Sequence, residues 1–406
     1  MNKNLDINWL VVSVLIGLPI IIIVGVVIYC MEYGWGMKES ILAIVTYYMA
    51  NISVGLGFHR LWTHASYKTK KPVEFFLMLL SAGTLQGPVL AWASDHKRHH
   101  AFADTAGDPH TPVLHTNKIK GFLWSHIGWM LVGDITANNI DKATMATLGK
   151  RKMLAWQLQY YWQLATGMNT IVPMLFGWCV FGSISLQSTI AGLFFVGLGR
   201  ALQQQMTFCV NSVCHILGTK QYANDSSGDI WWLCFLLLGE NYHNYHHAFA
   251  KDYRNGHKWY HFDVHKWLIA GLAKCGLASD LYVTPKERIE AKMIEMQSHL
   301  RTNWQKKLEN IEEIAIKLSI LAKTKISVAS NMADSVVNNI DNIGLHARNQ
   351  FAKLEESASA LAINIKSVIA HSEKLSARIV KIHVKKLKML QKSAMHLGLN
   401  VKFYHV

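Results

Sequence analysis

Cysteine is scarce in this 406-residue chain, and its distribution excludes a disulfide framework. The six cysteines are dispersed, mostly among apolar residues, and none forms a C-x-x-C pair. This pattern is typical of small core side chains in a reducing compartment. Proline is scarce as well, and none follows Pro285. The last third of the chain therefore lacks the residue that most strongly interrupts helices.

Acidic residues are few, 26 against 41 lysines and arginines, so the formal net charge is +15. The basic excess is marked after Pro285, where 20 lysines and arginines accompany 11 acidic residues. No DNA- or RNA-binding signature accompanies this charge, so we expect no nucleic-acid partner. Beside membrane helices, such an excess is more typical of attraction to anionic headgroups.

A signal-peptide cleavage site is also lacking after the first apolar run, Trp9–Tyr29, and the run is too long for a signal-peptide core. We expect it to be the first membrane helix. Apolar residues make up 51% of the chain, while 17% of the residues are charged. Together these values indicate a membrane protein with a large aqueous part.

Histidine, by contrast, is abundant, and nine of the 21 histidines stand at spacings typical of metal ligands. Those in H-x-x-H-H clusters share one face of a helix. His59 and His64 are five residues apart, about 140° around an ideal helix, so they could reach different metals or lie at a frayed helix end. Nine imidazoles exceed the needs of one ion, so we expect two metals a few ångströms apart. The nine are His59, His64, His96, His99, His100, His215, His243, His246 and His247.

Apolar runs long enough to cross a hydrocarbon core of about 30 Å occur at residues 9–29, 41–58, 162–181 and 186–207. A further apolar run, Val73–Ala93, would place the first histidine pair and the second cluster on opposite sides of the bilayer if it crossed. Ligands of one metal site must converge, and two glycines and a proline interrupt this run. We therefore expect it to be a broken or interfacial segment, and we predict four crossings with every cluster on one side.

Charge indicates which side that is. The segment from Arg60 to Ala165 carries 12 lysines and arginines against 6 acidic residues, whereas the loops on the other side carry few charges. By the positive-inside rule, we expect the histidines and both chain termini to be cytoplasmic.

The motifs HRLWTH, DHKRHH, NSVCH and ENYHNYHH, in this order and at these intervals, closely resemble those of the membrane-bound fatty acid desaturases of the Δ9 acyl-CoA (stearoyl-CoA-like) type. GDPHTP and SHIGW are similar to that family too, and the resemblance runs from about Tyr47 to Val283. It implies an all-α integral membrane protein with four transmembrane helices and a cytosolic helical cap that holds two iron ions, with O₂ as co-substrate. It assigns the nine histidines as the iron ligands, and Asn211 as a residue that contacts one iron through water. No catalytic residue beyond the metal ligands is implied.

The resemblance also implies a substrate, a saturated fatty acyl-CoA that receives a cis double bond, at the Δ9 position. Animal members of the family have asparagine and arginine where this chain has Gly87 and Ser94, so an acyl-phospholipid or another carrier is an alternative to CoA. Tyr47 is implied to close the end of the acyl tunnel, or else it packs in the second span. The residues implied to line the tunnel or its mouth are Gln86, Trp92, Asp95, Thr207 and Phe208.

Carboxylates close to the histidine clusters are candidate acceptors for imidazole N–H groups, or else surface and helix-cap acids. They are Asp95, Asp104, Asp108 and Glu240. The rival interpretations of the whole chain are a membrane hydroxylase, which uses similar histidine motifs, and a histidine-rich metal carrier. A carrier needs polar residues along its spans, whereas here the histidines cluster beyond the span ends.

We expect a membrane desaturase domain at residues 1–284 and a basic amphipathic helical tail at residues 285–406, to which the resemblance does not extend. Leu361–Ile369 and Ile379–Leu390 carry apolar residues at helical spacing with lysines between them. This tail could lie on the cytoplasmic leaflet, pair as a coiled coil or stay partly disordered. A cytochrome b5-like haem motif is lacking, as in bacterial-style members. We therefore expect a separate electron donor, a ferredoxin or flavoprotein reductase, and a bacterial inner-membrane location.

Overall fold

The computed structural model describes residues 6–132, 140–333, 341–371 and 375–399. The chain divides into two compact units, Met1–Lys292 and Met293–Val406. That residues 1–284 carry the desaturase function and residues 285–406 form a separate tail, as the sequence suggests, stays a prediction.

The first unit is built from helices. Its strands β1 (Lys68–Thr69) and β2 (Ala278–Ser279) form one short antiparallel pair, in which Lys68 faces Ser279. Its α-helices are α1 (Trp9–Val12), α2 (Leu18–Tyr33), α3 (Met37–Ile52), α4 (Lys71–Gly83), α5 (Val89–Phe102), α6 (Lys118–Leu123), α7 (Trp129–Leu131), α8 (Lys142–Thr147), α9 (Lys152–Gln159), α10 (Tyr161–Asn169), α11 (Ile171–Phe181), α12 (Leu186–Ser212), α13 (Cys234–Leu237), α14 (His243–Ala248), α15 (Val264–Lys274) and the start of α16 (Lys286–Ala333). Shorter π- and 3₁₀-helical segments are η1 (Ser13–Gly17), η2 (Ser53–Thr63), η3 (Trp124–Gly128), η5 (Leu148–Lys150), η6 (Val213–His215) and η7 (Trp231–Leu233).

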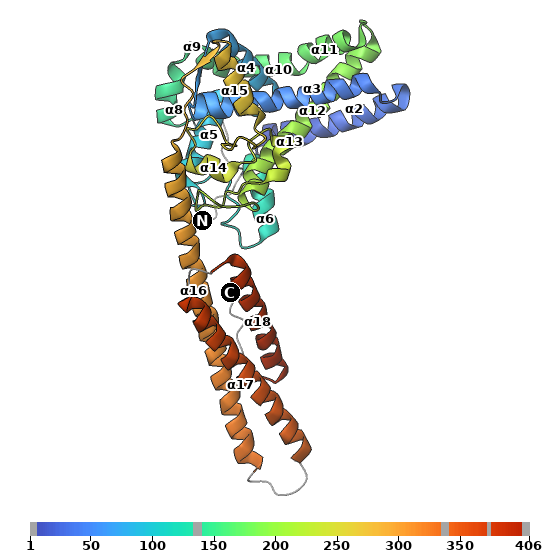
Figure 1. The fold of residues 1–406 in the computed structure, drawn as a ribbon. Helices are drawn as coiled ribbons and strands as arrows, with labels where there is room; N and C mark the ends of the chain where they lie inside the picture. Colours follow the sequence, from blue (N-terminus) through green and yellow to red (C-terminus); the bar gives the residue numbers. More distant parts are fainter. Residues whose placement is uncertain (1–5, 133–139, 334–340, 372–374, 400–406) are drawn as a thin grey trace. The chain divides into compact units, whose positions relative to one another are not determined.

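The long apolar helices of this unit lie side by side. Helix α12 packs against α2, α3 and α11, and the four extend together away from the helices that bear the histidine motifs (Figure 1). Within the described residues, helices long and apolar enough to cross a membrane are Trp9–Tyr33, Met37–Thr63 and Tyr161–Phe181. Ile21 and Ile28 of the first are each 62% exposed, as expected of side chains that face lipid.

Helix α12 corresponds to the fourth span expected from the sequence, but it falls short of the composition of a membrane helix. Arg200, Gln203 and Gln204 lower its apolar character, and all three are buried. The Gln204 amide donates to the carbonyl oxygens of Thr84 and Leu85, so these polar groups face protein. A polar face of this kind is tolerated where neighbouring helices satisfy it.

The apolar run at residues 73–93 is broken, as expected. It forms α4 and α5, and the chain between them turns at residues 84–88, where Gly87 has a φ of +91°. Helix α4 has 13 residues, about 20 Å of helix, which is too short to cross a bilayer. The histidine motifs before and after this run therefore lie in the same part of the unit.

The second unit contains three helices among its described residues: most of α16, α17 (Asp341–Ala370) and α18 (Ala377–His396). Its core joins residues from all three, among them Leu308, Ala315, Ile365 and Leu387, each at most 1% exposed. The apolar faces expected from helical spacing are thus used inside the unit. Burial of these faces is what stabilises a short helical bundle.

A close approach between α3 and α12 yields a stability prediction. A Cβ added at Gly199 would lie 2.1 Å from the Ala43 carbonyl oxygen, whereas one added at Gly167 in α10 would meet nothing within 4 Å. We expect Gly199→Ala to lower the free energy of unfolding by roughly 1–3 kcal/mol, because the helices must separate. Gly167→Ala, the control, should be neutral or stabilising by up to about 1 kcal/mol. Thermal unfolding in detergent measures both, and equal stability of the two variants would contradict the prediction.

Candidate metal centre

His59 lies on a π-helix, η2, that continues α3, and His64 follows directly as the C-cap of η2. The His64 backbone N–H donates to the His59 carbonyl oxygen at 3.1 Å, an i to i+5 hydrogen bond. The wider turn brings residues five apart onto one face. Of the two alternatives expected from the sequence, a position at a helix end fits His64, the C-cap of η2, and the centroids of the two rings lie 4.8 Å apart in the same cluster.

Five histidines form the first group. One ring nitrogen from each lies within 4.8 Å of all the others. The Nε2 atoms of His59 and His246 are 2.9 Å apart, those of His64 and His96 are 3.0 Å apart, and those of His100 and His246 are 2.9 Å apart. Residues from η2, α5 and α14 thus converge on one point.

The other four histidines form a second group. It consists of His99, His215, His243 and His247, again with one nitrogen each within 4.8 Å of the rest. The Nε2 atoms of His215 and His243 are 3.0 Å apart, and those of His99 and His247 are 3.2 Å apart. The rings of His100 and His247, one from each group, have centroids 4.5 Å apart, so the two groups are neighbours. A third set consists of His99, Asp108 and His110. In it His99 faces Asp108 with Nδ1, whereas its Nε2 faces the second group.

The spacing of these nitrogens fits transition-metal coordination. Two ligands bound at about 2.1 Å and at right angles to each other lie about 3.0 Å apart, which is the separation found here. An all-imidazole donor set suits iron, zinc or copper and not the hard cations that select oxygen. Burial lowers the pKa of seven of the histidines well below the usual value, so their rings are neutral and offer lone pairs. The residues therefore fit two metal ions.

Acceptors behind the rings fix which nitrogen faces inward. Asp108 accepts from His99 Nδ1 at 3.0 Å, and Asp225 accepts from His247 Nδ1 at 2.7 Å. His215 Nδ1 lies 2.7 Å from the Ser226 hydroxyl, which in turn contacts Asp104. With Nδ1–H directed outward, the Nε2 lone pairs of His99, His215 and His247 point to the centre of the second group.

Glu240 supports the first group in the same way. Its carboxylate lies 2.7 Å from His59 Nδ1, 2.9 Å from the Arg60 guanidinium and 3.0 Å from His265 Nδ1. Burial opposes ionisation of Glu240, but His59 and Arg60 outweigh it and hold the pKa of this carboxyl well below its usual range. Asp263 also pairs with Arg60, at 3.1 Å. The positive charge that stabilises Glu240 and Asp263 thus comes from Arg60, a residue of the same π-helix that carries His59.

Of the four carboxylates expected behind the rings, Asp108 and Glu240 lie beside ring nitrogens and Asp104 reaches His215 only through Ser226, whereas Asp95 has neither arrangement. It contacts no ligand ring in the described structure and instead lines a cavity. Burial raises its pKa to about 6. Asp225 and Ser226, which do support ligands, were missed because a D-S-S-G sequence is typical of a turn, and only the fold brings it behind His215 and His247.

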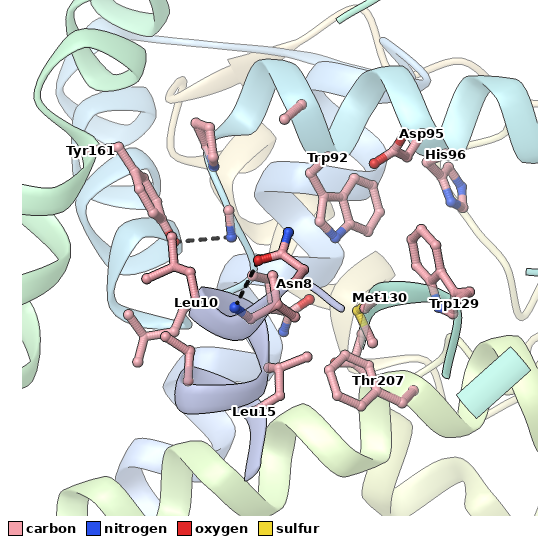
Figure 2. A pocket seen from close by; sticks show the side chains of 18 of the residues that line it. Asn8, Leu10, Leu15, Trp92, Asp95, His96, Trp129, Met130, Tyr161 and Thr207 are labelled. Carbon is pink, nitrogen blue, oxygen red and sulfur yellow. Dashed lines mark hydrogen bonds between the residues drawn. The ribbon is translucent and has the colours of Figure 1, made fainter. Parts of the chain in front are cut away.

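The cavity has a volume of about 400 Å³ and reaches the first metal group at His96. Figure 2 shows His96 and Asp95 on one side of the view and Tyr161 on the other, with Trp92 between them. Five of the residues implied to contact substrate lie on its wall, and so does Asn211: Gln86, Trp92, Asp95, Thr207, Phe208 and Asn211. Leu10, Val11, Val14 and Leu15 from the first apolar run also line the cavity, a role that its sequence does not indicate because a long apolar run is typical of a membrane span.

Tyr47 is not among the residues that line this cavity. Its hydroxyl donates to the Leu236 carbonyl oxygen at 2.6 Å, and the Asn51 amide donates to the same oxygen at 2.7 Å. This shared acceptor gives a physical reason for a polar residue at position 51 of the span. The Ser94 hydroxyl also has a partner within the protein, because it accepts a hydrogen bond from the Asp141 backbone N–H at 2.9 Å.

Comparison with known proteins agrees with this arrangement. The fatty acid desaturase family model matches residues 39–278. A probable acyl-CoA desaturase of Schizosaccharomyces pombe is 33% identical over 74% of this chain and 60% of its own length. Acyl-CoA desaturase 1 of Saccharomyces cerevisiae is 27% identical over 84% of this chain and 65% of its own length. Human stearoyl-CoA desaturase is 32% identical over 65% of this chain and 70% of its own length.

The chain therefore belongs to the fatty acid desaturase family. It spans less than two thirds of the length of the two fungal relatives. These relatives are fungal and mammalian, so they lend no support to a bacterial inner-membrane location, which stays a prediction.

The two groups predict the metal stoichiometry. We expect the wild-type chain to bind two transition-metal ions and His215→Ala to bind one, because the second group would lose one of its four histidines. His126→Ala is the control, since this ring contacts Ser212 and Gln205 and belongs to neither group. Elemental analysis of purified protein measures the ratio. Two ions in His215→Ala would contradict the assignment of the second group.

Proposed function

We propose that this protein is an O₂-dependent fatty acyl desaturase that inserts a cis double bond, at the Δ9 position, into a saturated acyl chain at a pair of iron ions. One observation carries the proposal: His96 belongs to the first metal group and also forms part of the cavity wall. A chain bound in that cavity would lie against the metal centre. A cavity of about 400 Å³ is within the usual range for a small ligand.

The nine histidines would hold the two irons, with Asn211 reaching one of them through water. Iron supplies the oxidising power needed to remove hydrogen from an unactivated methylene, which redox-inert zinc cannot provide. The protein's part is positioning. Asp108, Asp225 and Glu240 keep the imidazoles oriented, and the apolar wall excludes water beside them.

The substrate is proposed to be a fatty acyl-CoA, by analogy with the names of the relatives. Leu10, Val14, Leu15 and Phe208 would contact the acyl chain, with Gln86 and Thr207 at polar positions on the wall. Ser94 is held by Asp141 and Gly87 has no side chain, so neither would contact the CoA head. An acyl-phospholipid is the alternative carrier.

We propose that α12 crosses the membrane as a fourth span and that the metal centre lies in a cytosolic cap. The buried Gln203 and Gln204 support this, because their polar groups would face the protein and not lipid. The basic residues between Arg60 and Ala165 support a cytoplasmic location for the cap and both termini. Electrons are proposed to come from a separate ferredoxin or flavoprotein reductase.

Expression in a host that cannot make unsaturated acids tests the activity. We expect new monounsaturated acids in its lipids, and none with His246→Ala, because that residue belongs to the first metal group. His371→Ala is the matched control, because this exposed ring lies 2.9 Å from the Ser367 carbonyl oxygen and belongs to neither metal group. Lipid mass spectrometry gives the result. Hydroxy acids in place of monoenes would indicate a hydroxylase, and product from His246→Ala would refute the metal assignment.

The second unit gives a separate prediction. Its core is formed by residues from Trp304 onward, and the clusters around the metal centre lie before residue 283. We therefore expect a chain that ends at Lys292 to retain its metal and to desaturate at a rate within about threefold of the full chain, because the two hydrophobic cores share no residue. Metal analysis and lipid analysis in the same host test this. Loss of both metal ions on truncation would contradict it.

A further inference from the structure

Helix α18 in the second unit is a basic helix without a single acidic residue. Its 20 residues contain Arg378 and five lysines. Each of these six cations is exposed. A helix of this composition attracts anionic surfaces.

The apolar face of α18 is already in use. Val380, Leu387 and Ala394 are buried in the core of the second unit, at most 5% exposed. His383 Nε2 lies 2.8 Å from the Asn364 side-chain oxygen of α17, which fixes the rotation of the helix about its axis. The main apolar face of α18 is therefore not free to insert into a membrane, which is how a basic amphipathic helix commonly binds one.

The outward face carries the charge. Lys381, Lys385, Lys388 and Lys392 follow one another at intervals of four, three and four residues, so they form a single stripe. Exposed apolar side chains flank the stripe, Ile382 at 45% and Met389 at 63% on one edge and Met395 at 48% on the other. Lysines bordered by exposed apolar side chains match the composition of peripheral membrane surfaces.

We propose that this lysine stripe binds anionic lipid headgroups. The second unit is joined covalently to a unit with candidate membrane spans, so the stripe and a bilayer-bound unit belong to one chain and binding does not depend on a partner from solution. An acidic protein would have to be recruited from solution to the same face. Lysines near an anionic bilayer attract it electrostatically, and the three flanking side chains enter the headgroup region.

Vesicle sedimentation tests the proposal independently of desaturation. The full chain is reconstituted in phosphatidylcholine nanodiscs and mixed with sucrose-loaded vesicles of phosphatidylcholine, with or without about 30% phosphatidylserine. We expect at least roughly tenfold more protein to sediment with the anionic vesicles, and this binding to be lost at about 0.5 M salt. Replacing Lys381, Lys385, Lys388 and Lys392 with glutamine should reduce it to the level of phosphatidylcholine alone.

A matched variant separates this stripe from general basicity. Lys306, Lys307, Lys323 and Lys325 of α16 are also exposed, and their replacement with glutamine removes the same charge. That variant should retain most of the binding. Equal loss in both variants, or no preference of the wild type for anionic vesicles, would overturn the proposal. In the latter case an acidic protein would be the remaining partner for this face.

Discussion

The constraint on which this structure depends is the convergence of nine imidazole nitrogens in a buried volume. An imidazole binds a metal only when it is neutral and its lone pair faces the ion. Burial supplies the first condition, because it disfavours the charged ring. Asp108 and Asp225 supply the second for His99 and His247 by accepting from Nδ1, and the Glu240 carboxylate lies 2.7 Å from His59 Nδ1. These carboxylates are themselves costly to bury, which explains why Arg60 stands behind Glu240 and Asp263.

The sequence predicted which histidines come together far better than it predicted their surroundings. The H-x-x-H-H spacing fixes one helical face in α5 and again in α14, and both clusters lie as expected. The π-helix at residues 53–63 could not be foreseen, because the sequence carries no signal for a helix that widens by one residue per turn. Only that widening places His59 and His64 in one group. The choice of acceptors was equally hidden, since Asp225 and Ser226 lie in an irregular loop that tertiary folding alone positions.

The membrane part shows the same limit. Three spans follow from long apolar runs, with boundaries that move by a few residues because the helices continue beyond the apolar stretch. Helix α12 corresponds to the run at residues 186–207, from which we predicted a fourth span, but it is less apolar than the other three, and its polar residues are satisfied by neighbours that only the fold supplies. Conversely, residues 73–93 look like a span by composition and are not one. Hydropathy indicates whether a helix is apolar enough to face lipid, and the fold decides whether its side chains face lipid or protein.

The break between α4 and α5 connects these observations. Because the chain turns at residues 84–88 instead of crossing, the histidines on α5 lie on the same side as those on η2, and one metal group can use both. The same turn brings Gln86 and Gly87 to the cavity wall, where the Gly87 N–H donates to the Tyr161 hydroxyl at 2.9 Å. One turn of helix α5 then separates Trp92, on that wall, from His96, which belongs to both the cavity and the metal group. A single interruption of an apolar run thus assembles the metal centre and opens the space beside it.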